Sequence, residues 1–164
     1  MLDEVGRSAE AVREYERALA IHVSMAAADP VNDRLKMELA SDYNRLATAQ
    51  VRLGARAAAL ANHTRAVDMA RALQAKNPAD VEWKVSLALA LGERADAHAN
   101  LARRPSPAAR EADLAAAERD YAESVGILTD LQKAGAIAGT DLETLGTNRK
   151  ALERVRTERA RISN

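Results

Sequence analysis

Three histidines carry the most versatile side-chain chemistry in this chain, because imidazole binds metal ions and exchanges protons near neutral pH. His22, His63 and His98 fall on three different predicted helices, and none has a second His or a carboxylate four residues away, as a zinc-binding helix requires. His63 and His98 occupy positions where packing aromatics are expected. We therefore expect histidines that serve packing, while a metal site or a pH-sensing pair formed by His63 and His98 stays open.

Other catalytic chemistry finds little support in the sequence. The chain has no Cys, which excludes disulfides, thiolate metal sites and cysteine nucleophiles. It has no Phe, which excludes the Asp-Phe-Gly motif of protein kinases, and it lacks a Gly-rich phosphate loop. The sequence predicts a protein that is not an enzyme and has no cofactor. Apart from the open alternative at His63 and His98, it predicts no metal site.

Charge narrows the choice of partners. The 24 Lys and Arg residues balance 24 Asp and Glu residues, so the chain lacks the positive excess typical of nucleic-acid binders. The last predicted helix is locally basic, and we interpret it as a solvated face rather than a nucleic-acid interface. The short segment Arg103–Pro107 is interpreted as a surface loop.

The sequence contains no basic leader and no uncharged run long enough to span a membrane. We therefore expect a cytoplasmic protein without membrane insertion.

The elements that position these side chains repeat along the chain. At an offset of 48 residues, Asp29-Pro30 aligns with Asn77-Pro78, and Leu39-Ala40 aligns with Leu87-Ala88. A third copy carries ten extra residues, after which Tyr121 takes the place of Tyr15. Repeats of this length indicate stacked supersecondary units.

Apolar residues recur at steps of three and four within each copy, which predicts helices. Asp29-Pro30, Asn77-Pro78 and Ser106-Pro107 are typical of helix starts, and Thr140 to Glu143 form a capping box. Gly54 and Gly135 are typical of helix ends. We predict six antiparallel helices near residues 7–28, 30–53, 55–76, 78–102, 107–134 and 140–162.

Two sets of residues resemble the tetratricopeptide repeat family. The turn and second helix of its signature are similar to Gly6, Ala11, Tyr15, Ala18 and Leu19, and its first helix is similar to Tyr43, Leu46, Ala47, Gln50 and Gly54. The resemblance implies an all-α, right-handed solenoid of antiparallel helical hairpins. It gives one domain over residues 1–164, with repeat units near 1–29, 30–77 and 78–136 and a capping helix at 140–162.

The repeat is longer than the family norm, because each helix is stretched. This long-helix variant resembles the C-terminal region of bacterial serine/threonine protein kinases. The resemblance is carried by residues 25–46, with Met-Ala-Ala-Ala-Asp-Pro-x-Asn at 25–32 followed by Leu-Lys-x-Glu-Leu-Ala-x-Asp-Tyr-x-Arg-Leu at 35–46. The chain begins with a turn-like segment instead of a first helix, so we expect it to be the end of a longer protein.

In the tetratricopeptide family, first helices line a groove that holds a peptide. Transferred to this sequence, the groove residues are Ser41, Asn44, Arg45, Thr48 and Arg52 in one copy, and Gly92, Glu93, Asp96 and Asn100 in the next. The first set is polar and basic and the second acidic, which favours a mixed-charge helix or extended segment as ligand. The expected function is a non-catalytic protein-interaction module whose partner is a protein or peptide. The alternative is homodimer formation through the unpaired N-terminal helix.

Two further expectations concern packing. Equivalent positions on the apolar stripes predict a core that contains Tyr15, Leu39, Leu46, Leu87 and Tyr121. Arg94 stands where an apolar residue is expected, so we expect it either to extend its charged end to solvent or to pair with Glu93 or Asp96 on its own helix.

Overall fold

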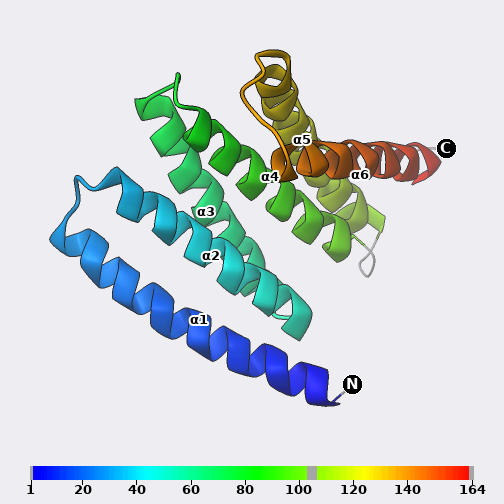
Figure 1. The fold of residues 1–164 in the computed structure, drawn as a ribbon. Coiled ribbons are helices and arrows are strands. Elements are labelled where there is room, and N and C mark those ends of the chain that lie inside the picture. The colour runs from blue at the N-terminus through cyan, green and yellow to red at the C-terminus, as the bar shows by residue number, and fades with distance from the viewer. Residues whose placement is uncertain (1, 103–106, 163–164) are drawn as a thin grey trace. The chain divides into compact units, whose positions relative to one another are not determined.

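A computed structural model describes residues 2–102 and 107–162 of the chain (Figure 1). These residues form six α-helices and no strand, as the sequence predicted. The helices are α1 (Leu2–Ala28), α2 (Asp33–Leu53), α3 (Arg56–Lys76), α4 (Val81–Leu101), α5 (Pro107–Lys133) and α6 (Thr140–Ile162). The predicted starts and ends agree within a few residues, except that α1 begins at Leu2 and not near residue 7.

The starts of α2 and α4 differ from the prediction. Neither Asp29-Pro30 nor Asn77-Pro78 opens a helix, since the capping residues are Asn32 and Asp80. The Asn32 Oδ1 accepts the Leu35 N–H at 3.0 Å, and the Asp80 Oδ1 accepts the Trp83 N–H at 3.1 Å. Each satisfies an N–H that the first turn of a helix leaves without a partner, and the prolines lie in the preceding turns.

The predicted glycine helix ends are confirmed. Gly54 has a φ of 79° and Gly135 a φ of 66°, a left-handed conformation that favours glycine. After each glycine the next N–H turns back to the helix, from Ala55 to the Gln50 carbonyl and from Ala136 to the Leu131 carbonyl, both at 2.9 Å. This is the Schellman arrangement, which satisfies carbonyls at the helix end.

The predicted capping box at Thr140 to Glu143 is wrong. Thr140 lies inside α6, and the N–H groups of Leu142 and Glu143 donate to the Gly139 carbonyl at 3.1 and 3.2 Å. The Gly139 carbonyl therefore accepts N–H groups of the first helical turn, a role that the sequence assigned to the Thr140 side chain. The loop interpretation of Arg103–Pro107 concerns residues 103–106, which lie outside the described residues, and Pro107 is the first residue of α5.

The chain divides into two compact units, Met1–Asn77 and Pro78–Asn164. In the first unit α2 packs against both α1 and α3. The buried apolar residues of this unit are small or branched, as expected of a chain with no Phe. The buried apolar residues are Leu35, Leu39, Ala40, Leu46, Ala47, Ala49, Ala59, Ala66, Val67, Ala70 and Leu73.

In the second unit α5 packs against α4 and α6, and α4 also contacts α6. One apolar cluster joins the three helices through Ala95, Ala117, Tyr121, Leu152 and Val155. A second joins them through Ala88, Leu128 and Leu145. This unit ends with α6, which contributes one buried stripe and is mostly polar on its other faces.

Burial confirms the predicted core at four of five positions. Leu39, Leu46, Leu87 and Tyr121 are buried. Tyr15 is half-buried, because it lies on α1, where none of residues 7–28 is buried.

Candidate functional site

Helix α2 exposes the stripe that the resemblance assigned to ligand binding. Ser41, Arg45, Thr48 and Arg52 follow at steps of four, three and four, which places them on one face of the helix. Arg45 and Arg52 are exposed, while Ser41 and Thr48 are half-buried. The buried residues of α2 lie on its other faces, so this stripe, which we call the α2 stripe, is not used by the core.

Two residues next to the α2 stripe, Asp42 and Asn44, make contacts within the unit. Arg45 Nη1 lies 3.5 Å from Asp42 Oδ1, and the same buried carboxylate contacts His22 on α1. Asn44, which the sequence assigned to the groove, contacts the buried His63 on α3, with 3.0 Å between Asn44 Oδ1 and His63 Nδ1. Its amide oxygen is therefore engaged inside the unit, and Asn44 serves packing as well as any binding role.

The candidate residues of α4 form a second exposed stripe. Glu93, Asp96 and Asn100 are all exposed. Asp96 accepts a hydrogen bond from the hydroxyl of the buried Tyr121. Burial, followed by this contact with a carboxylate, raises the pKa of Tyr121, so the phenol stays protonated as the donor.

Gly92 does not belong to that exposed face, contrary to the sequence assignment. It is buried, and a Cβ placed on it would lie 2.7 Å from the Asn148 Nδ2 of α6. The Asn148 Nδ2 donates to the Ser124 Oγ at 2.9 Å, and the Ser124 hydroxyl donates to the Ala88 carbonyl at 2.7 Å. Gly92 therefore gives α6 room to approach α4. The two candidate stripes lie in different compact units, and the charge-split groove that would combine them stays a prediction.

Arg94 pairs with a different helix from the one predicted. Its guanidinium makes two hydrogen bonds to the Asp120 carboxylate of α5, from Nε at 2.6 Å and from Nη2 at 2.8 Å. Both side chains are largely buried, with exposed fractions of 16% and 10%. A bidentate pair of this kind satisfies both charges, which explains how an arginine occupies a core position.

The histidines are held by neighbouring helices. His22 contacts Asp42, His63 contacts Asn44, and the Nδ1 of His98 lies 3.0 Å from the Asp113 Oδ1. The described ranges contain no group of three or more His, Asp or Glu side chains that could hold a metal ion. A metal shared by His63 and His98 would need residues from both compact units.

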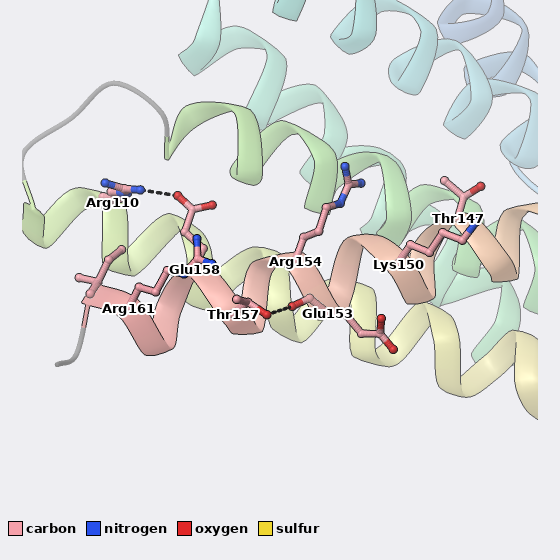
Figure 2. A pocket seen from close by; sticks show the side chains of 9 residues that line it. Arg110, Thr147, Lys150, Glu153, Arg154, Thr157, Glu158 and Arg161 are labelled. Carbon is pink, nitrogen blue, oxygen red and sulfur yellow. Dashed lines mark hydrogen bonds and ion pairs between the residues drawn. The ribbon is translucent and has the colours of Figure 1, made fainter.

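A surface hollow that the sequence did not single out lies along α6 (Figure 2). It has a volume of about 1030 Å³. Eight residues of α6 and one residue of α5 line it, and all but Ile162 carry polar or charged groups: Arg110, Thr147, Lys150, Glu153, Arg154, Thr157, Glu158, Arg161 and Ile162. Four cations and two carboxylates make this α6 hollow locally positive.

One signal in the sequence could have found this hollow. His63 and Tyr121 are equivalent in the repeat, so the offset between the second and third copies is 58 residues. The same offset places Arg154 at the position of Asp96, and Glu158 at that of Asn100. The last helix therefore carries residues at candidate binding positions, which its interpretation as a solvated face overlooked.

An ion-pair network attaches α6 to α5. Arg159 donates to Glu111 at 2.6 Å and to Glu118 at 2.5 Å, and Arg156 Nε donates to Glu118 at 3.0 Å. The hydrogen bond from Arg159, with that from Arg156, holds the pKa of Glu118 below its usual range. The hydrogen bonds of Arg159 to Glu111, first, and to Glu118 raise the pKa of its guanidinium. These hydrogen bonds attach the C-terminal half of α6, which lines the hollow, to α5.

Comparison of the chain with protein-family models, with curated proteins and with solved structures finds no match. Among the described residues, no helix is both long enough and apolar enough to cross a membrane.

Proposed function

We propose that this chain is a non-catalytic protein-interaction module of the tetratricopeptide type, which binds a peptide or helix of a partner protein along the α2 stripe. The observation that carries the proposal is the exposure of Arg45 and Arg52 on a face of α2 that the core does not use. Their spacing of seven residues corresponds to about 10 Å along the helix, two turns apart on the same side. Two guanidinium groups at that separation suit a ligand that carries carboxylates.

The resemblance of residues 25–46 to kinase-associated repeats supports a more specific context. In that context the chain is the docking tail of a bacterial serine/threonine kinase, and no part of it carries out catalysis. The coding sequence immediately upstream of the codon for residue 1 tests this context directly. A kinase domain that precedes residue 1 supports it, and an unrelated domain there contradicts it.

Binding by the α2 stripe is tested on an array of twelve-residue peptides whose net charge runs from acidic to basic. The double variant Arg45→Ala/Arg52→Ala should bind acidic and mixed-charge peptides more weakly by about 1–3 kcal/mol, because charge-assisted hydrogen bonds are lost. Its free energy of unfolding should stay within about 0.5 kcal/mol of the unchanged chain, since both side chains are exposed.

The matched control is Arg13→Ala/Arg17→Ala, which removes the same charge from exposed positions on α1. Equal binding by the α2 variant and the unchanged chain, or an equal loss in the control, would refute the α2 stripe as the binding surface.

Self-association through α1 is a second candidate function. No side chain of residues 7–28 is buried, and Ile21 and Met25, one turn apart, are 60% and 49% exposed. Adjacent exposed apolar side chains favour a partner surface. Light scattering should then report a dimer that Ile21→Lys converts to a monomer, while Leu89→Lys on α4 leaves the dimer intact. A monomeric unchanged chain at high micromolar concentration would exclude this candidate.

A further inference from the structure

The cations that line the α6 hollow are not all used within the unit. Arg110 Nη2 donates to the Glu158 carboxylate at 2.5 Å. Figure 2 marks this contact with a dashed line. Lys150, Arg154 and Arg161 are exposed and make no ion pair within the described residues. The hollow therefore presents three cations whose charges are available to an anionic ligand.

Their positions on α6 select the shape of that ligand. Lys150 and Arg154 are one turn apart, which separates them by about 6 Å along the helix axis. In an extended peptide, side chains at alternate positions point to the same side and lie about 7 Å apart. Two acidic side chains separated by one residue therefore match Lys150 and Arg154. Arg161, about 10 Å further along the axis, extends the positive potential toward the end of the helix.

The surroundings of these cations favour a peptide over a nucleic acid. Glu153 and Glu158 lie in the same hollow and would repel a continuous row of phosphates. None of the lining residues is aromatic, so the hollow offers no platform on which a base could stack. Ile162 lies at the end of the hollow, where it offers an apolar contact to a side chain of a bound peptide.

Packing and hydrogen bonds hold α6 against the rest of the unit. The buried residues Leu145, Asn148, Leu152 and Val155 fix the other face of α6, and the network around Arg159 ties its last turns to α5. Figure 2 shows Arg154 extending from α6 toward α4, where Asp96 binds the Tyr121 hydroxyl.

From these observations we infer that the α6 hollow is a second binding site, which takes an extended peptide segment with acidic side chains at alternate positions. It lies in the second compact unit and shares no residue with the α2 stripe. Either site can therefore fail its test without the other failing.

The test is an NMR titration of the whole chain at low ionic strength with two synthetic heptapeptides of the same composition. One has the sequence Ser-Ser-Glu-Ser-Glu-Ser-Ser, with alternate acids, and the other has Ser-Ser-Glu-Glu-Ser-Ser-Ser, with adjacent acids that point to opposite sides. A six-nucleotide oligothymidylate is titrated in parallel. The alternate peptide should shift the amide signals of residues 147–161 and bind more tightly than the adjacent one.

The variant Lys150→Gln/Arg154→Gln should weaken binding of the alternate peptide by about 10-fold, because two charge-assisted contacts are lost. The matched control Arg119→Gln/Lys133→Gln removes two exposed cations of α5 outside the hollow and should leave binding unchanged. Unchanged unfolding midpoints would show that both variants are folded. Equal affinity for the two peptides, tighter binding of the oligonucleotide, or an equal loss in both variants would each overturn the inference.

Discussion

The two compact units use equivalent positions with different chemistry. Leu46 in the first unit is equivalent to Arg94 in the second, and Asn62 is equivalent to Asp120. In the first unit these positions hold an apolar residue and an amide, and the Asn62 Nδ2 donates to the Gln50 Oε1 at 2.9 Å. The second holds a largely buried ion pair. A repeat can therefore keep its helices while the contacts between them change from neutral to ionic.

The terminal helices of the units differ as well. In the second unit α6 buries a stripe of five residues and binds α5 through Arg156 and Arg159. In the first unit α1 buries no side chain between residues 7 and 28 and exposes Ile21, Val23 and Met25. One terminal helix has the polar outer face that ends a helical stack, and the other exposes apolar surface suited to further packing.

The largest effect on stability is expected from breaking the buried ion pair between Arg94 and Asp120 in the second unit. Arg94→Leu should destabilise the chain by about 3–5 kcal/mol, because Asp120 is left buried without its counter-charge. Adding Asp120→Asn, which reproduces the residues of the first unit, should recover most of that loss. Chemical denaturation of both variants measures this. If the double variant is no more stable than Arg94→Leu alone, the equivalence of the two positions is refuted.

A smaller effect is expected where α4 meets α6. Gly92→Ala places a methyl group against the Asn148 amide and should cost about 1–3 kcal/mol through loss of the Asn148–Ser124 hydrogen bond.

Gly126→Ala on α5 is the matched control, because its Cβ would meet nothing within 4 Å. It should stabilise the chain by about 0.5–1 kcal/mol, as alanine is the better helix former. Thermal unfolding of the two variants should therefore move in opposite directions. Stabilisation by both would mean that α6 does not approach α4 at Gly92.

The smallest effect concerns pH. The pKa of Glu118 is lowered by Arg159 and Arg156, so the folded chain keeps this carboxylate ionised at a pH where the unfolded chain is protonated. Its stabilising contribution is present above the usual pKa of 4.5 and is lost as the pH falls below that value. Glu118→Gln should flatten the fall in unfolding midpoint that accompanies acidification below the usual pKa of 4.5. Asp33, whose pKa is lowered chiefly by Lys76, provides the comparison in the first unit. An unchanged slope in Glu118→Gln would show that this network does not hold α6.

The sequence predicted the helices well because their ends depend on local chemistry. Gly54 and Gly135 terminate helices through a conformation that glycine adopts readily, and the apolar stripes fix the buried faces. It misplaced the starts of α2 and α4, since Asn32 and Asp80 compete as caps with the residues beside the prolines.

The contacts between helices were harder to predict. The partner of Arg94 is 26 residues away on α5, and Gly92 is buried by Asn148 on α6. Residue spacing along one helix carries no information about either contact. The α6 hollow was missed for a different reason, because a basic solvated helix face and a basic surface hollow have the same composition.

Hydrogen exchange of backbone amides, measured by mass spectrometry on a monomeric sample, tests most directly whether the units end in different ways. We expect residues 8–20 of α1 to exchange much faster than residues 35–53 of α2 and residues 145–155 of α6, because α1 lacks buried side chains. Protection of residues 8–20 equal to that of α2 and α6 would contradict the conclusion that α1 presents an open surface.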